Sequence, residues 1–167
     1  MIDFARPQDT PAVARIINAA YDAGEAGLWQ AGGTRTTPEH VALLIANDEI
    51  AVARDDDGGA VVGAVRMRRL DHETAELGML SVDPHAFGTG AGRALLTFAE
   101  QHHGTQFMQL ELLVPRSGPH PQKIRLHDWY SRLGYVLISQ RELDEPLLAG
   151  PADLRTYRKS LRAAPAT

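Results

Sequence analysis

The sequence contains no cysteine among its 167 residues. Disulfide bonds, zinc sites built from thiolates and cysteine nucleophiles are therefore excluded. A chain without thiols suits a reducing compartment, and residues 1–7 lack the basic and apolar stretches of a signal peptide. We therefore expect a cytoplasmic protein.

Long apolar runs and an excess of positive charge are also missing. The longest apolar runs, such as residues 41–46, are far too short to cross a bilayer. The 17 Lys and Arg residues face 21 Asp and Glu residues, and the formal net charge of −4 does not favour a phosphate backbone as partner. We expect neither a membrane nor a nucleic acid among the partners, whereas a homodimer is compatible with the sequence.

The composition is that of a globular protein, with 44% hydrophobic and 23% charged residues. A chain of this length can bury one core, and no internal repeat or long linker divides it. The sequence predicts a single domain over residues 1–162 and a disordered tail at residues 163–167.

Hydrophobic periodicity predicts four helices. Asp9 or Thr10 is expected to cap the first helix, which ends at Gly24, and Thr37 begins the second. A third helix follows the glycines at residues 88–92, and a fourth ends at Gly134. One face of the third helix is predicted to hold Ala91, Ala94, Leu95, Phe98, Ala99 and His102.

Strands are predicted between these helices from apolar stretches that end at turn residues. They cover residues 2–5, 49–54, 60–70, 74–82, 107–114, 135–140 and 155–161, with a hairpin turn at residues 55–59. The order is then β-α-α-β-β-β-α-β-α-β-β. It indicates an α/β (α+β) fold in which a mixed sheet of about seven strands carries helices on both faces.

A glycine-rich turn between a strand and a helix is the strongest local signal. Gly88-Thr89-Gly90-Ala91-Gly92 leads directly into the third helix, whose first N–H groups have no partner inside the helix. Such a turn suits a phosphate group. The P-loop spacing is absent, and the dinucleotide pattern fails because its last position is Arg93.

The residues around this turn resemble a known motif. Residues 76–96 read ELGMLSVDPHAFGTGAGRALL, and they are similar to the acetyl-CoA-binding motif of the GNAT superfamily of N-acetyltransferases. That motif is a strand with L-x-V, then D-P, then Q/R-x-x-G-x-G/A. Gly90 and Gly92 match its glycines, whereas Phe87 stands where the family usually has Gln or Arg. Residues 128–135, DWYSRLGY, resemble a second family segment, W/F-Y-x-x-L-G-F/Y.

The resemblance implies a GNAT fold over about residues 2–161 and transfer of an acetyl group from acetyl-CoA to a primary amine. We expect direct attack in a ternary complex, no metal, and a small-molecule acceptor rather than a protein amino group. The histidines lack metal-ligand spacing. Two alternatives stay open: a catalytically impaired acyl-CoA-binding sensor or partner module, and another nucleotide-binding protein that uses the glycine turn.

The resemblance also implies which residues hold the coenzyme. The backbone N–H of Leu80 would bind the thioester oxygen, and Ser81 and Val82 would bond the pantetheine arm. Lys123, which stands where the family often has Asn, would either reach the 3′-phosphate or lie on a solvated helix face. The diphosphate would lie against Phe87, Gly88, Thr89, Gly90, Ala91, Gly92 and Arg93.

Three functions remain for side chains of the reaction. An alkyl amine has a pKa of about 10.4, so something must take its proton near neutral pH. Glu76 is the candidate base by resemblance, or else a solvated or ion-paired strand carboxylate. Tyr130 would protonate the leaving thiolate, or else pack in the core. Tyr21 and Trp29 would line the amine pocket, or else serve ordinary packing.

Overall fold

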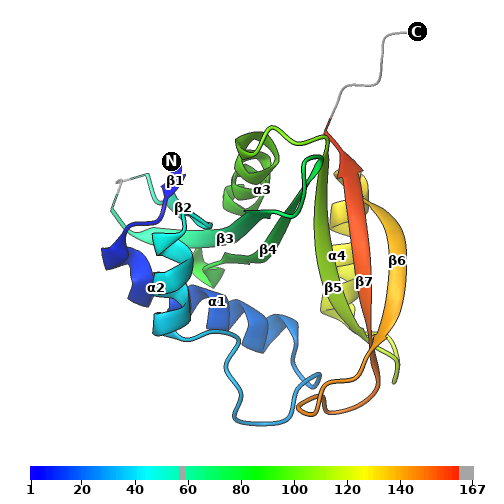
Figure 1. Cartoon of the computed structure of the whole chain (residues 1–167). Coiled ribbons are helices and arrows are strands. Elements are labelled where there is room, and N and C mark those ends of the chain that lie inside the picture. Colours follow the sequence, from blue (N-terminus) through cyan, green and yellow to red (C-terminus); the bar gives the residue numbers. More distant parts are fainter. Residues whose placement is uncertain (57–58, 162–167) are drawn as a thin grey trace, which may run out of the picture. The chain divides into compact units, whose positions relative to one another are not determined.

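Helices and strands follow one another in the predicted order (Figure 1). The computed structural model describes residues 1–56 and 59–161, so part of the predicted turn at 55–59 and the tail at 163–167 lie outside the described residues. Within them no helix is long and apolar enough to cross a membrane. The elements are β1 (Ile2–Phe4), η1 (Pro7–Asp9), α1 (Thr10–Gly24), α2 (Pro38–Ala46), β2 (Ile50–Arg54), β3 (Val61–Arg69), β4 (Thr74–Val82), η2 (Pro84–Ala86), α3 (Ala91–His102), β5 (Phe107–Pro115), α4 (Pro121–Arg132), β6 (Val136–Leu143) and β7 (Ala152–Ser160).

The strands form a mixed sheet in the order β1-β2-β3-β4-β5-β7-β6. Strand β4 runs parallel to β5 over residues 74–76 and 107–109, and β5, β7 and β6 pair antiparallel. The chain divides into two compact units. The first unit holds residues 1–23, 34–69 and 77–104, and the second unit holds residues 24–33, 70–76 and those from 105 onward. The α/β fold is as predicted, and the single domain over residues 1–162 stays a prediction.

Helix α3 covers one face of the strands in the first unit. Its buried residues are Leu95, Leu96 and Ala99, and a Cβ at Gly63 of β3 would lie 3.0 Å from the Leu95 side chain. The predicted face is therefore partly wrong, because Ala94 and His102 are exposed. The helix turns its 95/99 side to the sheet, and Phe98 lies at the flank.

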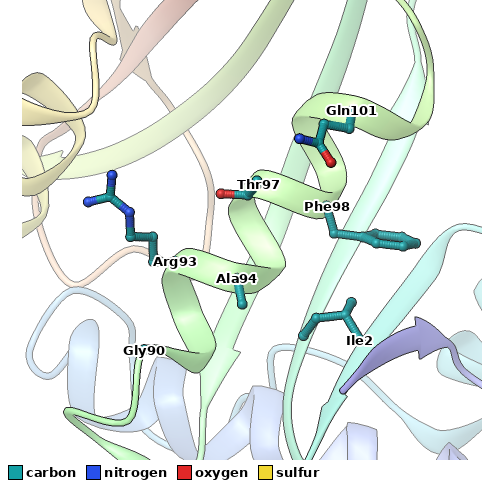
Figure 2. Close-up of a pocket in the computed structure, with 7 residues that line it drawn as sticks. All are labelled: Ile2, Gly90, Arg93, Ala94, Thr97, Phe98 and Gln101. Carbon is teal, nitrogen blue, oxygen red and sulfur yellow. The ribbon is translucent and has the colours of Figure 1, made fainter.

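The ring of Phe98 contacts β1 rather than the centre of the sheet. Its centroid is 5.7 Å from that of Phe4, in an edge-to-face arrangement, and it stacks on His102 at 6.0 Å. Figure 2 shows Phe98 on the same side of α3 as Ile2. These contacts place the N-terminal strand beside α3.

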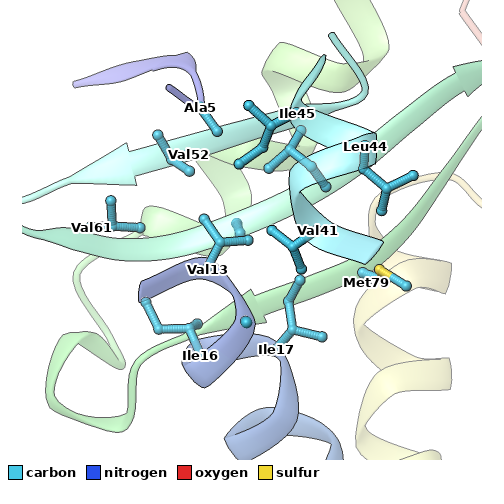
Figure 3. Packing of buried hydrophobic residues seen from close by; sticks show 13 residues of the cluster. Ala5, Val13, Ile16, Ile17, Val41, Leu44, Ile45, Val52, Val61 and Met79 are labelled. Atoms are coloured by element: carbon cyan, nitrogen blue, oxygen red, sulfur yellow. The ribbon is translucent and has the colours of Figure 1, made fainter. Parts of the chain in front are cut away.

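The core of the first unit lies on the opposite face of the strands, under α1 and α2 (Figure 3). Val13, Ile16 and Ile17 recur with the helical period, so they share the face of α1 that packs into this core. Thr37 caps α2 as predicted, since its side chain accepts the backbone N–H of His40. Buried members of this cluster include Val13, Ile16, Ile17, Val41, Leu44, Ile45, Val52, Val61 and Met79.

The start of α1 differs from the prediction that Asp9 or Thr10 caps it. Asp9 ends a 3-10 turn that leads directly into α1, and its carboxylate accepts the Arg6 backbone N–H at 2.8 Å. Arg54 donates to the same carboxylate at 2.7 and 3.2 Å. The hydrogen bond from Arg54 holds the pKa of Asp9 below its usual value. The Asp9 carboxylate is therefore used in an ion pair with Arg54 and in the 3-10 turn.

In the second unit, two faces of the β5–β7–β6 sheet are covered by different segments. Tyr157 of β7 meets α4, where its hydroxyl lies 2.8 Å from His127 Nδ1. Leu28, from the segment that follows α1, packs against Leu113 and Ala152. Ala152 and Tyr157 are an odd number of residues apart on one strand, so their side chains point to opposite faces.

Candidate active site

The loop between β4 and α3 has the backbone that an anion site requires. Gly88 and Gly90 have φ angles of 81° and 87°, a left-handed conformation that L-residues rarely adopt. Gly90 is the N-cap of α3 and has no side chain to occupy the first N–H groups of the helix. A Cβ at Gly92 would touch the Val82 side chain at 3.4 Å, so this glycine lets α3 approach β4 closely.

The segment before this loop is held by its own hydrogen bonds. The Asp83 carboxylate accepts the His85 backbone N–H at 3.0 Å and an Arg15 N–H at 3.2 Å. The His85 bond, followed by Arg15, holds the pKa of Asp83 below its usual value. Thr89 donates its hydroxyl to the Ala86 carbonyl at 2.7 Å. The loop is therefore preorganised, which lowers the entropic cost of binding a ligand.

Charge at this end of α3 also favours an anion. The first turn of α3 has no acidic residue, and exposed Arg93 forms no ion pair with the described residues. A cation near a helix N-terminus is unfavourable by itself, so an arriving diphosphate would relieve this repulsion. Figure 2 shows Arg93 directed away from Ile2 and Phe98. A shallow groove of about 460 Å³ runs along α3, lined by Ile2, Gly90, Arg93, Ala94, Thr97, Phe98 and Gln101.

Strand β4 has an irregular backbone just before Leu80. Met79 has a φ of 51° although it carries a side chain, and that side chain is buried. This conformation costs an L-residue about 1–2 kcal/mol, and such strain gathers at functional sites. The hydroxyl of buried Ser81 donates to the Met79 carbonyl at 3.0 Å. No residue type in this part of the sequence signals the strain at Met79.

Glu76 and Tyr130 belong to the second unit, whereas Leu80–Val82 and the glycine loop belong to the first unit. Glu76 is half-buried and stands opposite Gln109 in the last pair of the β4–β5 ladder. Tyr130 is buried in α4, with its ring 4.9 Å from that of Trp129 and 5.6 Å from that of Tyr135. Glu76 and Tyr130 each make further interactions within the chain. Their catalytic roles stay predictions.

Lys123 does not lie on a solvated helix face, and this expectation is wrong. Its side chain is only 5% exposed, and Nζ donates to Glu25 Oε1 at 2.9 Å. A buried ammonium needs a charged partner, because burial without one is very unfavourable. The ammonium is thus paired within the second unit, and a contact with the coenzyme 3′-phosphate stays a prediction.

Trp29 shares the carboxylate that holds Lys123. Its indole N–H donates to Glu25 Oε2 at 2.6 Å, and its backbone forms an isolated bridge with Leu148. Tyr21 lies in the first unit, where the Arg35 guanidinium is 4.9 Å from its ring. The acceptor role of these two aromatic residues stays a prediction. Glu25 is missed by the sequence reasoning, because no local pattern links residues so far apart along the chain.

Metal ligands do not gather in this part of the molecule. Among the residues that the structure describes, no three His, Cys, Asp or Glu side chains are placed to hold a metal ion. The site that the geometry does define is a preorganised anion loop after a strained strand.

The strand, the glycine loop and the helix on a mixed sheet are the arrangement that the resemblance to an acetyl-CoA-binding motif predicts. The family model described as "Acetyltransferase (GNAT) domain" matches residues 46–137, which is more than half of the chain. The chain therefore belongs to the GNAT family of acetyltransferases. It is an acyl-CoA-dependent N-acyltransferase with acetyl-CoA as cosubstrate and an amine-bearing acceptor.

Solved structures show the same fold. The protein yncA of Salmonella typhimurium, solved with its cofactor acetyl-CoA, is 19% identical, with a TM-score of 0.71 over 100% of this chain and 96% of that chain. A ribosomal-protein-alanine N-acetyltransferase of Brucella melitensis is 21% identical, with a TM-score of 0.70 over 96% and 99%. A phosphinothricin acetyltransferase of Sinorhizobium meliloti, in complex with acetyl-CoA, is 22% identical, with a TM-score of 0.66 over 100% and 91%.

The comparison with curated proteins found no match. At identities of this size the solved structures establish the fold alone. The names of two of them refer to different acceptors, a ribosomal protein and phosphinothricin. The acceptor of this chain therefore has to be argued from its own residues.

Proposed function

We propose that this protein transfers the acetyl group of acetyl-CoA to the primary amine of a small molecule by direct attack in a ternary complex. The observation that carries the proposal is the preorganised loop at residues 88–92, with its left-handed glycines at the N-terminus of α3. It suits the diphosphate of the coenzyme. The irregular backbone at Met79 precedes the N–H group of Leu80, which is proposed to bind the thioester oxygen.

Direct attack is supported by the side chains available for an acyl-enzyme. The sequence has no cysteine, and cysteine is the side chain most reactive toward thioesters near neutral pH. The Ser81 hydroxyl of the motif strand is buried and bonded to the Met79 carbonyl. Neither a thiol nor the hydroxyl of the motif strand is therefore available for an acyl-enzyme, and we propose the amine itself as the attacking group.

In the proposed proton transfers, Glu76 acts as the base and Tyr130 acts as the acid. As the C–N bond forms, Glu76 accepts the proton of the amine, directly or through water. As the C–S bond breaks, Tyr130 donates a proton to the departing sulfur, and bulk solvent restores both groups afterwards. Each transfer is of a kind that contributes about 10²–10⁴-fold to a rate.

A small acceptor is favoured by two loops of the second unit. Residues 24–33 and 144–149 are bonded to each other, since Gln30 N–H donates to the Leu147 carbonyl at 2.8 Å and Ala149 N–H to the Leu28 carbonyl at 2.9 Å. An extended peptide binds best to free main-chain groups. The main-chain groups named here already have partners, which argues against such docking on these loops.

The test is turnover of acetyl-CoA with a panel of small primary amines and of peptides with free N-termini or lysines. Release of free thiol is followed spectrophotometrically, and products are confirmed by mass. We expect turnover with a small amine and intersecting initial-velocity lines. Faster turnover of peptides would contradict the small acceptor, and parallel lines would contradict the ternary complex. Tight acetyl-CoA binding without any turnover would favour the impaired binding module.

A further inference from the structure

Phe87 occupies the position in the glycine motif where the family usually has a polar side chain. It directly precedes Gly88, at the start of the loop proposed to hold the diphosphate. Its backbone N–H donates to the Pro84 carbonyl at 3.3 Å, and the hydrogen bonds of Asp83 and Thr89 hold the residues on either side. The ring is therefore carried by a fixed backbone.

The side chain of Phe87 is not packed into the core of the first unit. It is 67% exposed, whereas Phe4 and Phe98 are packed edge to face. Among the described residues no ring or cation contacts the Phe87 ring. One exposed apolar residue is ordinary by itself. An exposed aromatic ring on a backbone that is held by hydrogen bonds, directly before the proposed diphosphate loop, is a more specific arrangement.

The chemistry of acetyl-CoA indicates which part of it such a ring would meet. Two arms leave the diphosphate, the pantetheine arm and the 3′-phosphoadenosine arm. The pantetheine arm is an aliphatic chain with amide groups, which suit the main chain of β4. Adenine is a flat aromatic group, which stacks on phenyl rings independently of hydrogen bonding.

We propose that Phe87 is the adenine-stacking residue of this enzyme, so that an aromatic contact replaces the polar contact of the family motif. The proposal rests on the assignment of the loop at residues 88–92 to the diphosphate. It does not depend on the identity of the acceptor amine. Stacking of one base on one aromatic side chain corresponds to about tenfold in affinity or more.

The experiment measures binding by titration calorimetry, without acceptor and without turnover. Acetyl-CoA is titrated into the protein and its variants, as is S-acetyl-4′-phosphopantetheine, which lacks the 3′-phosphoadenosine arm and one phosphate of the diphosphate. Phe87→Ala is expected to weaken the binding of acetyl-CoA about tenfold and to leave the binding of S-acetyl-4′-phosphopantetheine unchanged. Phe87→Leu keeps apolar bulk and should lose nearly as much, whereas Phe87→Trp should restore the affinity.

Leu43→Ala is the matched control, because Leu43 of α2 is also in the first unit and is 65% exposed. Leu43→Ala should leave the affinity for both ligands unchanged. Thermal unfolding checks that each variant is folded. Undiminished acetyl-CoA binding by Phe87→Ala, full binding by Phe87→Leu, or equal losses for both ligands would overturn the proposal. Absence of acetyl-CoA binding by the unaltered protein would overturn the coenzyme site itself, whereas failure of every amine would contradict the proposed function and leave the stacking proposal standing.

Discussion

Replacing Lys123 by Met tests the buried pair that the sequence does not reveal. The Lys123 and Glu25 side chains are only 5% and 10% exposed, and their charged atoms are 2.9 Å apart. Removing one partner of such a pair leaves a buried charge, which costs about 3–5 kcal/mol. Glu25 keeps its bond from the Trp29 indole, so we expect the lower end, about 3 kcal/mol, since a hydrogen bond to a charge is worth about 1.5–3 kcal/mol.

The assay is urea unfolding of Lys123→Met followed by circular dichroism. For a domain of this size the loss corresponds to a decrease of about 6–12 °C in Tm. Adding Glu25→Gln to Lys123→Met should recover most of the loss, because Gln removes the charge and keeps an oxygen for the Trp29 N–H. The coupling in this double-mutant cycle separates the pair from the packing of Lys123.

The same variant distinguishes the pair from a coenzyme contact. If Lys123 bound the 3′-phosphate, Lys123→Met would weaken CoA more than 3′-dephospho-CoA. We expect the ratio of the two affinities to stay unchanged. A free energy of unfolding within about 0.5 kcal/mol of the original, which is usual for surface substitutions, would refute the reasoning, as would a selective loss of CoA affinity.

Three other perturbations follow from the described contacts. Gly90→Ala forces a side chain into a φ of 87°, which costs about 1–2 kcal/mol, and calorimetry should show weaker acetyl-CoA binding. The control is Gly24→Ala, at a glycine with open space around its Cβ position, which should leave acetyl-CoA binding unchanged. Equal losses of binding in the two variants would contradict the role of the loop. Tyr130→Phe should lower kcat about a hundredfold or more while calorimetry shows unchanged acetyl-CoA binding; an unaltered kcat would remove Tyr130 from the mechanism. Because the pKa of Asp9 is held low by Arg54, this pair stabilises the fold fully above the unfolded pKa of about 3.9 and loses its effect as the pH falls through the folded value. Urea unfolding between pH 7 and pH 2.5 should therefore show a smaller acid loss for Asp9→Asn, and an identical pH dependence would contradict the pair.

Local sequence patterns predict most of the architecture. Strand β4 covers the predicted residues 74–82, and the other strands and the four α-helices lie close to their expected positions, whereas the local patterns do not predict η1 and η2. Turn glycines and apolar spacing act within a few residues, so they can be recognised in one sequence. The prediction of the buried face of α3 is partly wrong, because the spacing of apolar residues does not show which side of an apolar helix meets the sheet.

The missed features of the site depend on contacts between distant segments. Glu25 and Lys123 come from a loop and a helix that are far apart along the chain, and neither has a local signal for pairing. The left-handed φ of buried Met79 also has no local signal, since methionine has no preference for it. The glycine loop is different, because its left-handed backbone needs glycine, and glycines can be recognised in the sequence.

An NMR titration of ¹⁵N-labelled protein tests the central claim most directly, because it observes the loop amides one by one. Acetyl-CoA should shift the N–H resonances of Gly88, Gly90 and Gly92, and S-acetylpantetheine, which has no phosphate, should leave them in place. Saturating acetyl-CoA that shifts other amides and leaves these three unchanged would contradict the account.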